Sequence, residues 1–311
     1  MSKNVLVTGA AGLIGSHLCD VLLEKGCSVT GIDNLQFGNE LNVPKGVNFI
    51  QDRVQDLLWN KKIASERFHA IFHLASLKKV WNGTIHSSNV MSENFDMTRV
   101  VSAKAMNDNS KLIFTSTSDI YGNSKTFSED EEITMGPPTN LRYSYALSKW
   151  HSEQYILNDA KENGLKAVIV RVFGCASHRS NSGWSGGHIP LFIKEAKNDR
   201  DIIIHGDGLQ TRSISHAKDI AEGIFKASFL DEEIINLGTN QETTVKEVAE
   251  YIVKKTESTS KIIYKPIEEV FGNYNEIRRR FANIDKAKKL IDYKINYNTF
   301  EVIDEIIRSY K

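Results

Sequence analysis

The chain has 311 residues, and its 39 Lys and Arg balance its 39 Asp and Glu. This balance excludes a general attraction to nucleic acid or to an anionic membrane, and no apolar run reaches the ~20 residues of a membrane span. Cys19, Cys27 and Cys175 are odd in number and lack CxxC spacing, which argues against a disulfide framework and a metal site. We therefore expect a cytoplasmic protein without nucleic-acid, membrane or metal partners.

The first half of the chain alternates short apolar runs with segments of helical period, a pattern that is typical of βαβ units. The predicted strands are Val5–Thr8, Ser28–Asp33, Val47–Gln51, Ala70–Leu74, Lys111–Ser116 and Ala167–Phe173. The predicted helices between them are Leu13–Glu24, Ser92–Met106 and Tyr145–Asn163. This order predicts an α/β fold with a doubly wound parallel sheet in residues 1–174.

After residue 174 the texture of the sequence changes. Ser177–Gly187 is rich in Ser and Gly, and short strands then mix with helices around Lys218–Phe229 and Val245–Lys255. We expect residues 175–311 to form mainly a smaller α+β substrate lobe, interleaved with the first domain. Ser177–Gly187 is interpreted either as a mobile loop over the substrate or as a surface insertion.

Three glycines follow the first predicted strand and open the first helix, at Gly9, Gly12 and Gly15. Glycines permit a tight turn and a close backbone approach, so the helix N-terminus can offer N–H groups to a pyrophosphate. Asp33, at the end of the second strand, can accept hydrogen bonds from ribose hydroxyls and repel a 2′-phosphate. The pattern predicts NAD rather than NADP. The predicted contacts in this part are Gly9, Gly12, Leu13, Ile14, Gly15, Asp33 and Asn34.

Tyr145 and Lys149 lie four residues apart, which places a phenol and an ammonium on one helical face. A nearby cation stabilises a phenolate and lowers its pKa, so Tyr145 can act as a base. This spacing is common by chance. Behind a dinucleotide site, however, it favours catalysis.

The glycine spacing resembles the TGxxGxxG signature of the short-chain dehydrogenase/reductase superfamily, and in particular its extended, nucleotide-sugar-modifying members with a Rossmann fold. Asp52 with Arg53 looks like the adenine-contacting position, and His73-Leu74-Ala75-Ser76 looks like the strand end that lines the cofactor. Asn94 with Thr98 is similar to the family's Asn-x-x-x-Thr helix. The resemblance implies a homodimer, and cofactor contacts at Asp52, Arg53, Leu74, Ala75, Ser76, Tyr145 and Lys149.

The strand end Thr117-Ser118-Asp119-Ile120-Tyr121-Gly122 resembles the family's catalytic strand end. The resemblance implies transient oxidation at C4 of a nucleotide sugar, with the hydride passing to NAD. In that reaction Tyr145 takes the hydroxyl proton, Thr117 bonds the reacting oxygen, and Lys149 holds the ribose and the phenolate charge. The resemblance also implies that Asp119 is a further catalytic residue and Ser118 a substrate contact. A UDP-sugar 4-epimerase is the first expectation. UDP-glucuronate decarboxylase and 4,6-dehydratase stay open, because relatives of both kinds carry an acid at the position of Asp119. Pro137-Pro138 and Arg142 resemble a segment that decarboxylases share with bacterial epimerases.

The segment Gly206–Arg212 looks like the family's GDGxQxR, in which an arginine clamps the diphosphate of the substrate. Arg212 is therefore the predicted substrate-binding residue. Asn273 falls near the position of a second phosphate arginine, and Arg278, Arg279 and Arg280 either compensate for it or form a solvated edge. Outside this reaction class, an NAD(P)H-dependent sugar-ketone reductase and a non-catalytic NAD-binding regulator remain alternatives.

Overall fold

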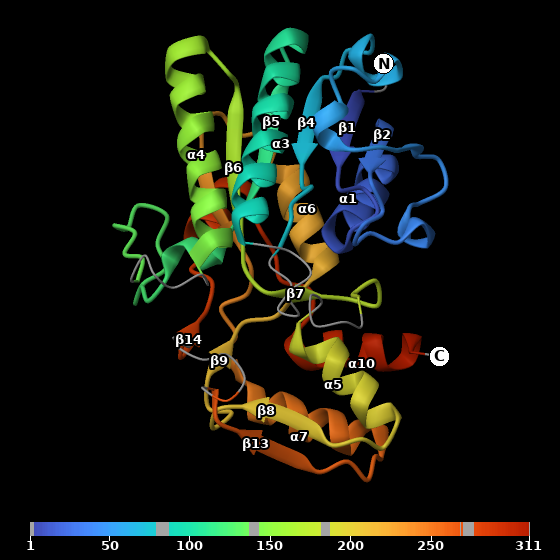
Figure 1. Ribbon diagram of the computed structural model, residues 1–311, viewed down its shortest axis with the longest axis vertical. Helices are drawn as coiled ribbons and strands as arrows, with labels where there is room; N and C mark the ends of the chain where they lie inside the picture. Colours follow the sequence, from blue (N-terminus) through green and yellow to red (C-terminus); the bar gives the residue numbers. More distant parts are fainter. Residues whose placement is uncertain are drawn as a thin grey trace.

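A central parallel sheet organises the computed structural model, which describes residues 3–78, 87–136, 143–181, 187–267, 269 and 277–310 (Figure 1). Its seven strands lie in the order β11-β6-β5-β4-β1-β2-β3, and every pairing is parallel. The strands are β1 (Asn4–Thr8), β2 (Ser28–Asp33), β3 (Asn48–Gln51), β4 (Ala70–His73), β5 (Lys111–Thr117), β6 (Ala167–Val172) and β11 (Ile234–Leu237). This arrangement confirms the doubly wound fold.

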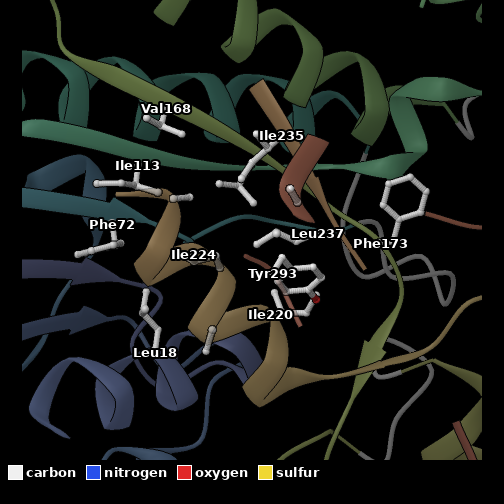
Figure 2. Close-up of a cluster of buried hydrophobic side chains, with 14 of the residues drawn as sticks. Leu18, Phe72, Ile113, Val168, Phe173, Ile220, Ile224, Ile235, Leu237 and Tyr293 are labelled. Carbon is white, nitrogen blue, oxygen red and sulfur yellow. The ribbon is translucent and has the colours of Figure 1, made fainter. Parts of the chain in front are cut away.

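Helices cover both faces of the sheet. On one face, α1 (Leu13–Glu24) and α6 (Ala217–Ala227) pack together, and Figure 2 shows Ile220 and Ile224 of α6 with Leu18 of α1 in this cluster. On the other face, α3 (Ser87–Asp108) packs along α4 (Ser144–Asn163). Burial of these apolar faces supplies the main favourable free energy for the layers.

The second lobe lies beyond one end of the sheet in Figure 1 and has its own apolar core. Three helices, α5 (His188–Lys197), α7 (Val245–Thr256) and α10 (Thr299–Ser309), surround the parallel pair β8 (Ile202–His205) and β13 (Ile262–Lys265). The remaining short strands are β7 (Cys175–Ala176), β9 (Thr211–Arg212), β10 (Ser215–His216), β12 (Thr243–Thr244) and β14 (Arg279–Arg280). The remaining helical segments are η1 (Glu40–Asn42), η2 (Val54–Asp56), α2 (Lys61–Ala64), η3 (Ser118–Tyr121) and α9 (Asp285–Ile291).

The chain returns to the sheet after entering the second lobe, because β11 pairs with β6 and α6 packs on the sheet. The expected division at residue 174, with a substrate lobe interleaved with the first domain, remains a proposal. Among the described helices none is long and apolar enough to cross a membrane. The same ranges contain no group of three or more His, Cys, Asp or Glu side chains suited to hold a metal ion.

Candidate active site

A cavity of about 920 Å³ opens where the carboxyl ends of the parallel strands meet the second lobe. Ligands of open α/β sheets bind at this edge, because the loops that follow the strands converge there. Most of the predicted site residues line this cavity: Gly9, Gly12, Leu13, Ile14, Gly15, Asp33, Asn34, Leu74, Ala75, Ser76, Thr117, Ser118, Asp119, Tyr145 and Lys149.

The glycine turn between β1 and α1 leaves no room for side chains. Gly9 has φ of +74°, and a Cβ there would lie 2.8 Å from the backbone nitrogen of Ala75. At Gly15 a Cβ would lie 2.0 Å from the carbonyl oxygen of Gly9. Gly12 begins α1 without a side-chain cap, and no acidic residue lies in the first turn. The positive end of the helix therefore faces the cavity, as an anion site requires.

The Asp33 carboxylate is held in place by the backbone. Its Oδ2 accepts a hydrogen bond from the Ala11 amide at 3.1 Å, and its Oδ1 accepts one from the Leu35 amide at 2.8 Å. Burial raises the pKa of this carboxyl group, and the two amides oppose that shift. A Cβ at Gly38 would lie 3.0 Å from both carboxylate oxygens. The end of β2 thus presents a fixed acceptor pair to the cavity.

The loop after β4 is fixed from two sides. The Thr8 hydroxyl accepts hydrogen bonds from the amides of Leu74 and Ala75, both at 3.2 Å. Asn94 of α3 bridges the amide and carbonyl of Leu77 and donates to the Ser148 hydroxyl of α4 at 3.0 Å. Asn94 therefore joins the cofactor loop to the helix that carries Tyr145.

The phenol of Tyr145 meets the ends of two strands. It makes hydrogen bonds with Ser76, after β4, and with Thr117, at the end of β5. Burial and the negative charge of Asp119 raise its pKa, and the two hydrogen bonds oppose that shift only partly. The lowered phenol pKa expected from Lys149 is therefore not what the protein shows by itself.

The Lys149 ammonium points to the backbone of β5. Its Nζ donates to the Thr115 carbonyl at 2.9 Å and lies 4.7 Å from the centre of the Phe114 ring. Burial lowers the pKa of Lys149 to about 7, although the Glu153 carboxylate one turn further along α4 opposes the shift. The ammonium can lose its proton near neutral pH, an unusual property for a lysine.

A second charged group faces the same end of the cavity. Asp119, in η3, forms an ion pair with Nη1 of Arg280 from β14. The side chain of Arg280 is 15% exposed, and its Nε is buried without a hydrogen-bond partner among the described atoms. The three consecutive arginines therefore differ in their surroundings. Arg278 pairs with Asp207, Arg279 pairs with Glu242, and the side chains of both arginines are exposed. Only Arg280 of the three lines the cavity.

Three predicted contacts lie elsewhere in the described structure. Asp52 accepts hydrogen bonds from the Arg53 amide at 2.8 Å and from Asn60 at 2.7 Å, and neither Asp52 nor Arg53 lines the cavity. Arg212 donates to the carbonyls of Thr211 at 2.7 Å and Ile277 at 2.8 Å, outside the cavity wall. Burial lowers the pKa of His188, which lines the cavity, and the positive charge of Arg212 lowers it further. These three roles remain predictions.

Some expected features lie outside the described residues, namely Pro137-Pro138, Arg142, Trp184 and Asn273. The structure adds cavity residues that the patterns did not name, including His188 and Tyr310, and it brings His178 and Arg179 of the segment Ser177–Gly187 to the cavity. Their sequence neighbourhoods carry no spacing signal. Only the fold brings them to the cavity.

The cavity residues fit a dinucleotide. The turn at Gly9 to Gly15 is a cradle that a Cβ would fill, with a helix N-terminus for the diphosphate. Asp33 supplies acceptors for ribose hydroxyls. Tyr145 and Lys149 lie further along the same cavity, where a substrate sugar and a second ribose would meet.

Comparison with known proteins agrees with this geometry. The model of the "NAD dependent epimerase/dehydratase family" matches residues 5–238. The chain is 33% identical to a UDP-N-acetyl-alpha-D-glucosaminuronate decarboxylase of Bacillus cytotoxicus, with 100% of this chain and 98% of that protein covered. It is 30% identical to a putative UDP-glucose 4-epimerase of Methanocaldococcus jannaschii, with 92% of each covered.

Among solved structures, the UDP-glucose 4-epimerase of Thermotoga maritima with UDP-glucose superposes with a TM-score of 0.89. That protein is 25% identical, and the match covers 98% of each chain. The UDP-N-acetylglucosamine 4-epimerase of Methanobrevibacter ruminantium, in complex with UDP-N-acetylmuramic acid, gives a TM-score of 0.86 at 26% identity, covering 99% of this chain and 98% of that one.

Proposed function

Because the chain belongs to the NAD-dependent epimerase/dehydratase family, whose members are enzymes that use NAD, we propose that it oxidises C4 of a UDP-linked sugar transiently and reduces it again within one turnover. When bound, NAD supplies the acceptor and later the donor of the C4 hydride. The observation that carries the proposal is the meeting of Tyr145, Thr117 and Lys149 beside the dinucleotide cradle.

Tyr145 is the proposed proton acceptor for the 4-hydroxyl. Thr117 and Ser76 orient its phenol, so the oxygen is held toward the cavity. An alcohol loses its hydride readily only if its proton leaves as well, and a positioned phenolate is suited to take that proton. Removal of this oxygen should abolish turnover and leave the fold unchanged.

Lys149 is the proposed source of positive charge near the phenol. In the protein alone its Nζ bonds to the Thr115 carbonyl and its pKa lies near 7. A lysine of this kind can hold or release a proton at working pH without leaving the buried site. We infer that it also binds the ribose beside the reacting sugar.

We propose 4-epimerisation as the outcome. An epimerase must turn the 4-keto sugar so that hydride returns to its other face, which needs room at the reacting end. The cavity of about 920 Å³ is shared by cofactor and substrate and is lined by both lobes. A putative UDP-glucose 4-epimerase is among the relatives, and UDP-sugar 4-epimerases are among the solved structures that superpose on the chain.

Decarboxylation of a UDP-sugar acid is a second candidate, favoured by Asp119 and Arg280. The unpaired Nε of Arg280 is a buried donor, and a substrate carboxylate could accept a hydrogen bond from it. Arg280 already pairs with Asp119, so a second carboxylate must compete with it or share the guanidinium. The relative with 33% identity is named as a decarboxylase of this kind.

Products from a panel of nucleotide sugars distinguish these outcomes. We would incubate the purified protein with UDP-glucose, UDP-glucuronate and their N-acetyl analogues and identify the products by mass spectrometry and NMR. Epimerisation keeps the mass, whereas decarboxylation loses CO₂. Asp119→Asn should leave an epimerase largely active and should harm a decarboxylase. Turnover without added cofactor, with NAD retained through purification, would exclude a simple reductase.

We also propose a homodimer through α3 and α4. Apolar side chains remain exposed along this pair of helices, among them Met91, Trp150 and Leu157. Phe95 of α3 stacks on His151 of α4 at 4.2 Å between ring centres, at the same surface. A twofold contact would bury both copies of this face. Light scattering at micromolar concentration tests the proposal, and a monomer would contradict it.

A cytoplasmic location is proposed as well. Cys19, Cys27 and Cys175 are unpaired, and burial raises the pKa of each thiol, which makes thiolate reactions slow. Free thiols of this kind suit a reducing compartment. Fluorescence of a tagged full-length protein in its own cell would test the location.

A further inference from the structure

A cluster of three histidines surrounds one carboxylate beside the cofactor end of the cavity. Glu305 of α10 binds His178, in the loop after β7, through Oε1 and binds His216 of β10 through Oε2. Its Oε1 also lies 3.4 Å from the backbone amide of His178. Burial would raise the pKa of Glu305, but the hydrogen bonds from the two imidazoles outweigh it, so the pKa is lowered and the carboxylate stays ionised.

This carboxylate fixes residues 177–181, which we call the cavity loop. Four residues of the cavity loop line the cavity, from His178 to Asn181. Its first residue, Ser177, is buried and hydrogen-bonded to His17 of α1 at 2.9 Å, and Arg179 pairs with Asp20 of α1 at 2.7 Å. The cavity loop therefore lies along α1, the helix whose first turn forms the diphosphate cradle.

The C-terminal helix closes the same wall. Ile306, Ser309 and Tyr310 line the cavity within about one turn of Glu305. Glu305 thus joins two parts of the wall that come from segments 127 residues apart in the chain. A ligand held at the cradle is enclosed only while both parts stay in place.

The three imidazoles differ in their contacts and in their exposure. Nδ1 of His216 accepts the Lys218 amide at 3.0 Å, so its proton must lie on Nε2, toward Glu305. Burial, with smaller contributions from Arg179 and the other two histidines, lowers the pKa of His17 to about 3, so His17 is neutral. His178 is 41% exposed, and its ring nitrogen on Glu305 forms an ion pair when the ring is protonated.

We propose that Glu305 is a positioning residue that holds the cavity loop against bound NAD through His178 and His216 and thereby slows cofactor release. The proposal rests on NAD binding and does not depend on the sugar chemistry.

The rate of NADH release tests the proposal without any sugar. Protein loaded with NADH is mixed with excess NAD at a fixed pH, and the loss of bound NADH fluorescence is followed. Glu305→Gln removes the charge of the side chain and should release NADH about two- to fivefold faster than wild type, the range expected for one partly exposed charged contact.

Two further variants make the test specific. Asp304→Asn changes the neighbouring carboxylate of α10, which bonds to Tyr251 and Lys255 of α7, and should behave as wild type. His178→Gln removes the imidazole that bonds to Oε1 of Glu305 and should also release NADH faster than wild type. A release rate equal to that of wild type in either Glu305→Gln or His178→Gln would overturn the proposal.

Discussion

The two walls of the cavity are built in different ways. On the sheet side, backbone positions determine the site: the turn at Gly9, the amides on Asp33 and the strand end at Thr117 all follow directly from the β1–α1–β2 and β5 geometry. On the lobe side, side chains from distant segments converge, as in the pair Arg280 with Asp119, 161 residues apart. The parts of a site that the backbone forms can be recognised from local sequence patterns. The parts that side chains from distant segments form can be recognised only once the fold is known.

The largest expected effect lies where the two walls meet, at Tyr145. Tyr145→Phe keeps the ring and removes only the oxygen that Ser76 and Thr117 orient. Turnover should fall by ~10²–10⁴, the usual contribution of a positioned general base, while binding of NAD and nucleotide sugar stays within a few-fold of wild type. Steady-state rates and titrations measure both. A variant that keeps more than about a tenth of the wild-type rate would exclude Tyr145 as the base.

A change in the sheet wall should act on the cofactor alone. Gly15→Ala places a Cβ 2.0 Å from the Gly9 carbonyl oxygen, so the turn must shift. Overpacking of this kind costs about 1–3 kcal/mol, or roughly 10–100-fold in NAD affinity if the cost falls on the bound state. Gly26→Ala is a control with the same chemical change outside the cavity, because a Cβ there meets nothing within 4 Å, although its positive φ adds some strain. Unchanged NAD affinity in Gly15→Ala would mean that the turn is not the cradle.

Cofactor choice tests the other backbone-held group. The fixed Asp33 carboxylate should repel a 2′-phosphate, so NAD should bind at least about tenfold more tightly than NADP, since like charges a few ångströms apart cost more than 1.4 kcal/mol. Titration of both cofactors measures the ratio, and Asp33→Asn should narrow it. Equal affinities in the wild-type protein would show that Asp33 does not face the adenosine ribose.

The smallest effect concerns proton binding by Lys149, whose pKa burial lowers to about 7. Above pH 7 the folded protein releases this proton, while the unfolded chain keeps it up to the ordinary lysine pKa near 10.4. The unfolded state then binds more protons, so the free energy of unfolding gains up to ~1.4 kcal/mol per pH unit from this residue.

Lys149→Met, which has no proton to release, should lack this gain. Urea denaturation at pH 7.5 and 9 gives the change of the free energy of unfolding with pH for the cofactor-free wild type and variant. The contribution of the buried thiols is the same in both proteins, so it cancels in the difference between the two slopes. Parallel slopes would show that the lysine pKa is ordinary in the folded protein.

Much of the sheet side was predictable from the sequence. The helix Leu13–Glu24 and the strand Ser28–Asp33 have the predicted bounds. The glycine turn, the helical period of the apolar residues and the strand-forming residues all indicate the same boundaries there. The described part of α3 already includes Ser87, five residues before the predicted start, because the residues before Ser92 are mostly polar and carry no apolar period. Tyr145 and Lys149 line the same cavity as Thr117, because the helix α4 that carries them packs against β5 and η3.

The lobe side was less predictable, for a physical reason. The run Arg278-Arg279-Arg280 has one local chemistry, yet the short strand β14 sends only Arg280 to the cavity. Likewise, Ser177–Gly187 was expected to be a mobile loop or a surface insertion, but its described part is tied to α1 and α10. Local sequence does not contain such partners, because they lie more than 100 residues away.

The most direct test of the account uses the UDP-sugar that the protein converts, prepared with deuterium at C4. Because hydride leaves C4 and returns within one turnover, the product should retain deuterium at C4, and a single turnover should be slower than with the unlabelled sugar. Tyr145→Phe should form no labelled product on the same time scale. Replacement of the C4 deuterium by hydrogen from water would contradict transient oxidation at C4, because the label would then have left as a proton.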